Sequence, residues 1–284
     1  MNSPRRIAIV CYSLAGKGKS LRICQQLQDQ LQARQIIPTV FADVWPADFN
    51  AFTDVFIVGG DGTLNYFINR YPNISIPLSI FKGGSGNDFA WKLYGNTSIE
   101  AQLETVMKSA PKPVDAGLCN GYYFLNGAGI GFDGEVVQAM GKKRFFSAGY
   151  LAYLWTVIKK IAVYREKELK LVYNGEQKTD KFFLLSIANG SRYGGGFKVA
   201  PQAVVNDGFL DLVEIRCIHR LRRIFYLPKV EKGKHLDLSF VSATRIKRIL
   251  IQSSAKVAAH LDGEFMLSDY FDIEVLPGKF KFRY

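Results

Sequence analysis

Short apolar runs alternate with amphipathic segments through the first third of the chain. Four apolar runs predict buried strands, at Ile7–Cys11, Pro38–Phe41, Asp54–Val58 and Ile76–Phe81. The amphipathic segments predict helices at Ser20–Gln35, Leu64–Arg70 and Asn87–Tyr94, and in the first of them Leu21, Cys24, Leu27 and Leu31 share one face. Because buried strands that alternate with helices form parallel sheets covered on both faces, this part is predicted to be an α/β domain.

The pattern changes near Pro111-Lys112-Pro113, beyond which strand-like runs are joined by short turns. Asn120-Gly121 and Asn174-Gly175 each separate two such runs, and Asn-Gly favours a type I′ hairpin because both positions tolerate positive φ. One long helix is predicted near Ala148–Val163. Further strands are expected at Phe209–Ile215, Leu236–Val241, Ile246–Ile251, Val257–Leu261, Phe271–Leu276 and Phe280–Tyr284, with a turn at Pro277-Gly278. We therefore predict an α/β domain of residues 1–113 and an antiparallel β domain of residues 114–284.

The composition is that of a globular protein with excess positive charge. Apolar residues make up 48% and charged residues 22%, and the formal net charge is +12. This excess favours an anionic partner, such as a nucleotide, nucleic acid or an acidic membrane surface. The four cysteines form no CxxC pair, which argues against a zinc site and fits a reducing, cytoplasmic compartment. No run approaches the ~20 apolar residues of a membrane span, so membrane contact is predicted to be peripheral.

The first candidate site follows the predicted strand Asp54–Val58. Gly59-Gly60-Asp61-Gly62-Thr63-Leu64-Asn65 stands where a strand ends and a helix begins. Glycines let a backbone approach a ligand closely, and a helix start offers free N–H groups to an anion. Asp61 adds a carboxylate for a metal or a hydroxyl, and Thr63 adds a hydroxyl for a phosphate. The alternative is a tight turn capped by Asp61, although ligands gather at the carboxyl ends of strands in such sheets.

A second loop of the same kind follows the next predicted strand. Gly83-Gly84-Ser85-Gly86-Asn87-Asp88-Phe89-Ala90 combines a glycine turn with polar residues before a helix. By itself the segment would be a capped turn. Two such loops from neighbouring strands of one sheet favour a shared phosphate site.

The two loops, about twenty residues apart, resemble those of the diacylglycerol-kinase catalytic family, which includes bacterial diacylglycerol kinases, broader lipid kinases and sphingosine kinases and is more distantly related to NAD kinases. Further motifs of that family follow in order along nearly the whole chain. They are Val114-Asp115-Ala116-Gly117, Asn126-Gly127-Ala128-Gly129-Ile130-Gly131-Phe132-Asp133, Asn189-Gly190, Gly194-Gly195-Gly196 with Ala200-Pro201, Asn206-Asp207-Gly208-Phe209-Leu210-Asp211 and His260-Leu261-Asp262-Gly263-Glu264. The resemblance implies an N-terminal nucleotide-binding domain and a C-terminal β-sandwich-like domain with the active site between them.

The resemblance also assigns roles by position. It implies an ATP site made by Gly16, Gly59, Gly60, Asp61, Gly62, Thr63, Asn65, Ser85 and Asn87. Asp61 and Asp88 are implied catalytic residues, Asp88 through a network of Mg²⁺ and water. A structural Mg²⁺ is implied at Asp207 with the carbonyls of Val204 and Phe209. The implied activity is ATP- and Mg²⁺-dependent phosphorylation of a lipid hydroxyl, such as that of diacylglycerol.

Asp262 and Glu264 match the acidic pair from which the family takes its catalytic base. Phosphoryl transfer asks mainly for positioning and charge neutralisation, so glycine loops, a metal and a base suffice. The two residues are two apart and would share one face of an extended backbone, where one could accept the proton. We favour Glu264 as the base. Without the companion motifs, a solvated acidic turn would be the better interpretation.

The chain departs from the family pattern at several positions. The first strand is followed by Tyr12-Ser13 in place of Asn-Pro, and Tyr66 stands where the family commonly has Glu. Lys82 replaces the Pro before the second loop. The C-terminal return to the first domain is expected to be absent or very short. Nucleotide preference, acceptor and activity therefore stay open, and a catalytically weak nucleotide- or lipid-binding protein is one alternative.

The predicted partners are ATP, a membrane lipid and the surface of an anionic membrane, with a homodimer left open. Lys142-Lys143-Arg144 beside Phe145-Phe146, and seven Lys or Arg between Arg216 and Lys234, are candidates for membrane contact, with a solvated face as the alternative. An NAD kinase-like enzyme is the nearest rival, but no Gly-Ser-Thr-Ala-Tyr-like segment is found. Ser13-x4-Gly18-Lys19-Ser20 misses the leading glycine of a P-loop. No nucleic-acid motif accompanies the charge, so no nucleic acid is expected.

Overall fold

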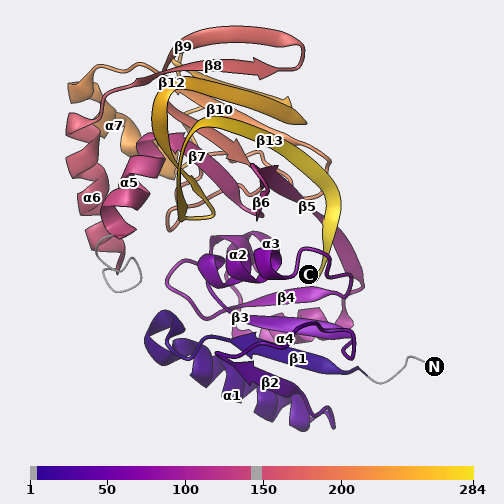
Figure 1. The fold of residues 1–284 in the computed structure, drawn as a ribbon. Coiled ribbons are helices and arrows are strands. Elements are labelled where there is room, and N and C mark those ends of the chain that lie inside the picture. The colour runs from indigo at the N-terminus through magenta and orange to yellow at the C-terminus, as the bar shows by residue number, and fades with distance from the viewer. Residues whose placement is uncertain (1–4, 142–148) are drawn as a thin grey trace. The chain divides into compact units, whose positions relative to one another are not determined.

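The computed structural model describes residues 5–141 and 149–284, and the chain divides into two compact units (Figure 1). Unit 1 comprises Met1–Val114 and Gly278–Tyr284, and unit 2 comprises Asp115–Pro277. The division after Val114 lies one residue from the predicted boundary. The assignment of all of residues 114–284 to the second domain is wrong for Gly278–Tyr284, because this end of the chain belongs to unit 1.

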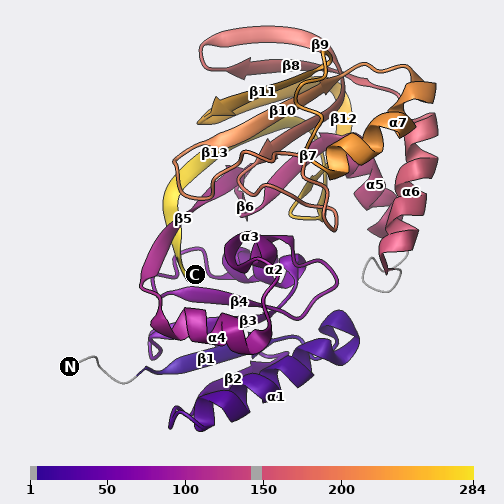
Figure 2. The same cartoon turned by 180° about the vertical axis from the view of Figure 1, so that it is seen from behind.

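Unit 1 is a sheet with helices on both faces. Its strands are β1 (Ile7–Cys11), β2 (Thr39–Ala42), β3 (Asp54–Gly59) and β4 (Leu78–Lys82), in the order β2-β1-β3-β4. Each neighbouring pair runs parallel. The helices are α1 (Lys19–Gln32), α2 (Asp61–Arg70), α3 (Asp88–Tyr94) and α4 (Ile99–Lys108), preceded by the 3-10 turn η1 (Ala15–Gly18). Helices α2 and α3 lie together on one face of the sheet, and α1 and α4 on the other (Figures 1 and 2).

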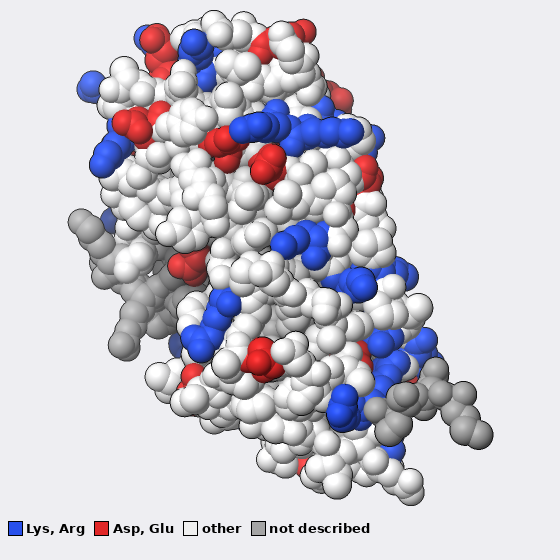
Figure 3. All heavy atoms as spheres, turned by 45° about the vertical axis from the view of Figure 1, so that its right-hand side comes forward, with Lys and Arg blue, Asp and Glu red and all other residues white. Residues whose placement is uncertain are grey.

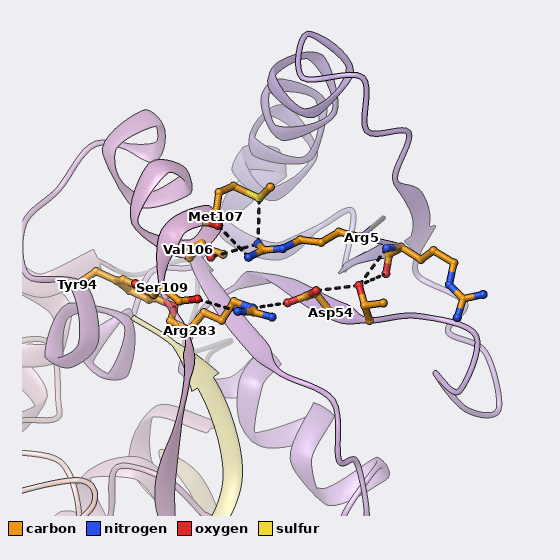
Figure 4. Close-up of polar contacts among 9 residues, drawn as sticks. Arg5, Asp54, Tyr94, Val106, Met107, Ser109 and Arg283 are labelled. Atoms are coloured by element: carbon orange, nitrogen blue, oxygen red, sulfur yellow. Dashed lines mark hydrogen bonds and ion pairs between the residues drawn. The ribbon is translucent and has the colours of Figure 1, made fainter. Parts of the chain in front are cut away.

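The C-terminal end of the chain joins the sheet of unit 1. Strand β13 (Glu264–Arg283) pairs parallel with β4 through Phe282 and Leu78. Arg283 donates from Nε to Asp54 Oδ1 at 2.5 Å and from Nη1 to the Ser109 carbonyl at 2.7 Å, as Figure 4 shows. The Tyr94 hydroxyl donates to the Arg283 carbonyl at 2.7 Å. The return to the first domain is therefore short but present, and a buried ion pair holds it.

Unit 2 is a curled antiparallel sheet with helices on one side. Its strands are β5 (Pro111–Cys119), β6 (Tyr122–Phe124), β7 (Gly127–Gly131), β8 (Lys167–Tyr173), β9 (Glu176–Ala188), β10 (Leu210–Arg216), β11 (Val241–Ile246), β12 (Arg248–Leu261) and the first part of β13. Strand β9 pairs with β8, β7 and β10, and β12 pairs with β13, β7 and β8, so the sheet folds back on itself. The helices are α5 (Phe132–Gly141), α6 (Gly149–Val163) and α7 (Arg220–Glu231).

Two apolar cores form on opposite faces of the strands of unit 2. Along β10, Leu210 and Leu212 point into the core enclosed by the sheet, whereas Val213 and Ile215 point into the core beneath the helices. Strand β9 is buried on both faces from Phe182 to Ala188. The strands therefore separate a sheet-enclosed core from a helix-covered core.

Local turn chemistry was predicted better than tertiary packing. Both Asn-Gly pairs have positive φ at each position and close hairpins, which confirms that prediction. Leu21, predicted on the buried face of α1, is 44% exposed, and Ile23 is buried instead. The predicted strand Leu236–Val241 is wrong, because the strand begins at Val241. The predicted turn at Pro277-Gly278 is wrong too, since β13 continues through it.

Candidate active site

The glycine loops of unit 1 pack backbone against backbone. Gly83, which follows β4, donates its N–H to the carbonyl of Gly59 at the end of β3, at 2.9 Å. A Cβ on Gly84 would come within 3.0 Å of the Cα and N atoms of Gly60, closer than real Cβ atoms approach. Gly16 has a φ of +59°, and a Cβ there would meet the Gly83 carbonyl. The glycines of three loops are therefore needed for contact with one another, before any ligand is considered.

Asp61 ties the two predicted phosphate loops together. Its Oδ2 accepts from the Asp88 N–H and its Oδ1 from the Phe89 N–H, each at 3.0 Å. Its own N–H donates to the Gly86 carbonyl at 3.1 Å. The carboxylate thus caps the first turn of α3 from the neighbouring loop. A catalytic role for Asp61 and Asp88 stays a prediction, but the structure brings the two residues together as the motif spacing suggested.

The remaining predicted nucleotide ligands lie on or beside these loops. Asn87 folds the second loop, because its side chain accepts from the Gly84 N–H at 3.1 Å and donates to the Gly84 carbonyl at 2.8 Å. Ser85 is exposed at the tip, and Asp88 is 3% exposed. Asn65 lies further along α2, where its Oδ1 accepts from Asn69.

Two helices begin at these loops without a side-chain cap. Gly18 precedes α1 and Gly60 precedes α2, and neither helix start receives a cap hydrogen bond from its N-cap side chain. Thr63 lies in the first turn of α2, with its side chain against the Cα of Gly59. Uncapped helix starts present N–H groups and a partial positive charge, which suits a phosphate group.

Two of the departures from the family pattern, Tyr12 and Tyr66, contact each other in unit 1. The rings of Tyr12 and Tyr66 lie 5.8 Å apart, and Trp45 lies 4.8 Å from Tyr12 and 5.4 Å from Tyr66. Burial and the hydrogen bond with Tyr66 raise the pKa of Tyr12 to about 12. The hydrogen bond with Arg70 lowers the pKa of Tyr66. Tyr12 and Tyr66 therefore belong, with Trp45, to one aromatic cluster beside the first glycine loop, which the sequence did not reveal.

In unit 2, Asp262 lies in a turn and not on an extended strand. Asp262 and Gly263 have φ values of +50° and +91° and form the two-residue loop of the β12–β13 hairpin. The Asp262 carboxylate accepts from the N–H groups of Leu125, Asn126 and Gly127 at 2.8–2.9 Å. The prediction placed Asp262 and Glu264 on one face because side chains alternate along a strand. That argument is wrong, because Asp262 lies in the hairpin loop and not on a strand. The Asp-Gly pair was an available hairpin signal.

Glu264 begins β13 directly after this turn and has an exposed side chain. The surrounding protein density raises the pKa of Glu264, and the charge of Asp262 raises it further. Its exposed tip remains available, whereas Asp262 is held by three backbone groups. The choice of Glu264 as the base therefore stays a prediction.

In this structure the predicted structural metal ligand Asp207 is engaged by groups of the protein, and its role as a metal ligand stays a prediction. Asp207 Oδ1 accepts from the Phe209 N–H at 3.1 Å, and Oδ2 forms an ion pair with Arg245. The Arg245 guanidinium also lies 4.5 Å over the Phe209 ring, so a cation already neutralises this carboxylate. Among the residues that the structure describes, no group of three His, Cys, Asp or Glu side chains could hold a metal ion.

Other family motifs of unit 2 form a buried hydrogen-bond network. Asp115 accepts from the Gly208 N–H at 2.7 Å and holds the segment that follows Asn206. The side-chain amide of Asn189 donates to the carbonyls of Asp115 and Leu125 at 2.9 and 2.8 Å. These residues fix the strand ends around the acidic turn. The hydrogen bonds of Asp115 and Asn189 therefore give these two motif residues a structural role.

An apolar cavity of about 60 Å³ lies in the helix-covered core of unit 2. Its walls come from α5, α6 and α7 and from the strands beneath, and they include Phe132, Phe183, Ile215, Leu227, Val230 and Phe240. Asp133 and Tyr193 also line the cavity, and the Tyr193 hydroxyl donates to Asp133 Oδ2 at 2.7 Å. The buried ring of His260 packs edge-on against Tyr193 at 5.3 Å. The prediction from sequence missed this polar group, although Asp133 and His260 belong to the matched motifs.

Burial changes the ionisation of Asp133, on the cavity wall, and of His260. Burial raises the pKa of Asp133 to about 6, although the hydrogen bond from Tyr193 opposes the shift. Burial lowers the pKa of His260 to about 4, so its imidazole is neutral at pH 7. An apolar space with the Tyr193–Asp133 hydrogen-bonded pair on its wall suits a ligand with an alkyl chain and a polar head.

Asp133→Asn is expected to stabilise the protein at neutral pH and to change its stability little near pH 4. The pKa of an unfolded Asp is about 3.9, so as pH rises the unfolded chain loses this proton before the folded protein does. The free energy of unfolding therefore falls between about pH 4 and the raised pKa of Asp133 in the folded protein. Above that window we expect the variant to gain about 2 kcal/mol in unfolding free energy. Urea unfolding at both pH values measures this gain, and Asp237→Asn, at an exposed position, is the control. Equal gains at both pH values would contradict the ionisation argument.

No helix among the described residues is long and apolar enough to cross a membrane. Segment 142–146, predicted as a basic and aromatic membrane contact, lies outside the described residues. In the view of Figure 3, Lys and Arg side chains are spread over the surface among uncharged residues. This face therefore shows no continuous basic stripe.

Comparison with known families decides which group of proteins the chain belongs to. Residues 127–282 match the YegS C-terminal NAD kinase beta sandwich-like domain, and residues 6–119 match the diacylglycerol kinase catalytic domain. The chain belongs to the diacylglycerol-kinase family. The fold is accordingly a two-domain diacylglycerol kinase and NAD kinase-like fold whose C-terminal domain is β-sandwich-like.

Individual relatives agree with this membership. A diacylglycerol kinase of Bacillus subtilis (strain 168) is 29% identical over 237 residues, which is 82% of this chain and 76% of the relative. A diacylglycerol kinase of Mycobacterium tuberculosis (strain ATCC 25618 / H37Rv) is 27% identical over 230 residues, which is 78% of this chain and 74% of the relative.

Solved structures share the fold of this family member. The crystal structure of a diacylglycerol kinase from Bacillus anthracis str. Sterne has a TM-score of 0.73 at 20% identity and covers 100% of this chain and 98% of its own. An NAD kinase from Archaeoglobus fulgidus in complex with ATP has a TM-score of 0.57 at 14% identity and covers 98% of this chain and 93% of its own. At these identities the likeness concerns the fold alone.

Proposed function

We propose that this chain is a kinase that transfers the γ-phosphoryl group of ATP to a hydroxyl of a membrane lipid, such as diacylglycerol. The observation that carries the proposal is the set of three interlocked glycine loops in unit 1. Two helices start at these loops, and we infer that the positive ends of their dipoles and the N–H groups that follow Lys19 and Asp61 in their first turns face a triphosphate. Membership of the diacylglycerol-kinase family supports ATP as the donor.

In the proposed reaction, the Gly16, Gly60 and Gly84 loops hold the phosphates, with Thr63 and Ser85 as hydroxyl donors. Mg²⁺ that arrives with ATP neutralises charge on the β- and γ-phosphates. Such a Mg²⁺ needs only one or two protein carboxylates besides the phosphates, and Asp88 is our candidate. Asp61 keeps the two loops in register through its bonds to the start of α3.

The proposed acceptor half of the reaction lies in unit 2. Glu264 takes the proton from the lipid hydroxyl as the oxygen attacks the γ-phosphorus, and ADP leaves. The apolar cavity accepts part of the alkyl chain, with Asp133 and Tyr193 on its polar wall. At about 60 Å³ the cavity is too small for a whole acyl chain, so we infer that the covering helices move outward when lipid enters.

The decisive experiment offers labelled ATP and a total lipid extract to the purified protein. We expect a labelled lipid phosphate, identified by the mass of the phosphorylated product, and no transfer when Mg²⁺ is chelated. NAD is offered in a parallel reaction, since the fold is shared with an NAD kinase. Labelled NADP without labelled lipid would replace the proposal with NAD kinase activity, and ATP binding without transfer would indicate a catalytically weak binding protein.

A further inference from the structure

Helix α7 has one face built into unit 2. Arg223 is 3% exposed and donates from Nη1 to the carbonyls of Ile161 and Tyr164 at 3.1 and 2.8 Å. Its Nη2 forms an ion pair with Glu166. Leu227 lines the cavity on the same face of the helix. These contacts fix the rotation of the helix about its axis.

The opposite face of α7 is apolar at its centre and basic around it. Phe225 follows Arg223 by two residues, about 200° around the helix, and is 75% exposed. Arg222, Lys229 and Lys232 are exposed on the same side. An exposed Phe side chain forgoes the free energy that burying it in the core would have contributed. The arrangement is therefore unexplained by the packing of unit 2.

The surrounding sequence adds charge of one sign. Between Arg216 and Lys234 the chain holds seven Lys or Arg and a single acidic residue, Glu231. An amphipathic helix with an aromatic ring among cations is the kind that lies in the interface of an anionic bilayer, with the ring near the acyl boundary and the cations at the headgroups. Single-stranded nucleic acid also uses cations and an aromatic ring together, but no recognised nucleic-acid motif accompanies the charge in this sequence.

We propose that α7 is a membrane-docking helix that lies flat on an anionic lipid surface with Phe225 inserted. The inference rests on the proposed function and deepens it, because the inner face of the same helix lines the cavity assigned to the acyl chain. Docking through the outer face would place a lipid one helix thickness from that cavity. The partner is a bilayer that contains acidic phospholipid, and the cations and the ring bind it jointly.

Co-sedimentation with vesicles, in the absence of ATP, tests the proposal. The vesicles are phosphatidylcholine alone or phosphatidylcholine with phosphatidylglycerol, at low salt. We expect binding to the anionic vesicles only. One cation near such a surface changes partition about fivefold, so Arg222→Gln with Lys229→Gln should weaken binding about 25-fold. Phe225→Ala should weaken it several-fold, and Phe225→Trp should restore it, since Trp favours the interface.

Matched controls remove similar groups elsewhere. Ile37→Ala deletes a side chain that is 84% exposed in unit 1, and Arg22→Gln with Lys256→Gln removes two exposed cations from α1 and β12. Both controls should bind vesicles as the unaltered protein does. Equal losses in the controls, or unchanged binding of the α7 variants, would overturn the proposal. Since binding is measured without catalysis, failure to phosphorylate any lipid would count against the proposed function alone.

Discussion

Gly84→Ala is expected to remove most kinase activity and to destabilise unit 1. The new Cβ would lie within 3.0 Å of the Cα and N atoms of Gly60, and both partners are backbone atoms that no rotamer change can move. The two glycine loops must therefore separate. A displacement of about 1 Å at a phosphate site costs on the order of 100-fold in rate, and overpacking costs about 1–3 kcal/mol in stability.

Transfer of labelled phosphate from ATP and urea unfolding measure the two effects of Gly84→Ala. Gly141→Ala is the matched control, because a Cβ there meets no atom of the described residues within 4 Å. We expect the control to keep both activity and stability. Activity of Gly84→Ala within twofold of the unaltered protein would show that the contact between the loops is dispensable.

The contact between the loops illustrates what the sequence could predict. Spacing placed Gly59 and Gly83 at the ends of neighbouring strands, and the structure brings the two loops together. The packing partners of these glycines could not be predicted from the sequence. The sequence suggested a ligand, whereas the nearest neighbours of Gly60 and Gly84 are each other's backbones, because long-range contacts leave no local signature.

Helix α5 was missed for a related reason. Its first turns contain Gly134, and glycine lowers helix propensity by about 1 kcal/mol. A Cβ at Gly134 would collide with the backbone of Ala258 in β12, so tertiary packing requires the residue that obscures the helix. Asp133, which enters the cavity from this helix, was therefore missed as well.

Glu264→Gln and Asp262→Asn are expected to separate catalysis from folding. Glu264→Gln removes the proposed proton acceptor, and loss of a general base typically lowers turnover 10²–10⁴-fold, so we expect a loss of about that size. Its stability at pH 7 should be unchanged or slightly higher. Because the pKa of Glu264 is raised in the folded protein, its ionised form is disfavoured there above the unfolded pKa.

Asp262→Asn should instead lower stability by about 2 kcal/mol, since an amide nitrogen would face one of the backbone N–H groups that the carboxylate now satisfies. Asn tolerates the positive φ of this turn, so the hairpin itself should survive. Urea unfolding and initial rates on both variants provide the measurements. A Glu264→Gln enzyme with undiminished turnover would reject Glu264 as the base.

The pH dependence of Asp262→Asn then tests whether the two carboxylates act as a pair. A general base must be ionised, so kcat/KM of the unaltered enzyme should fall on the acid side through the raised pKa of Glu264. Removing the negative charge of Asp262 lowers that pKa, and the acid limb should move to lower pH in the variant. An acid limb that stays in place in Asp262→Asn but vanishes in Glu264→Gln would leave Glu264 as the base and assign its raised pKa to the surrounding protein density alone. The direction of this shift therefore distinguishes a residue that only shapes the turn from one that also sets the ionisation of its neighbour.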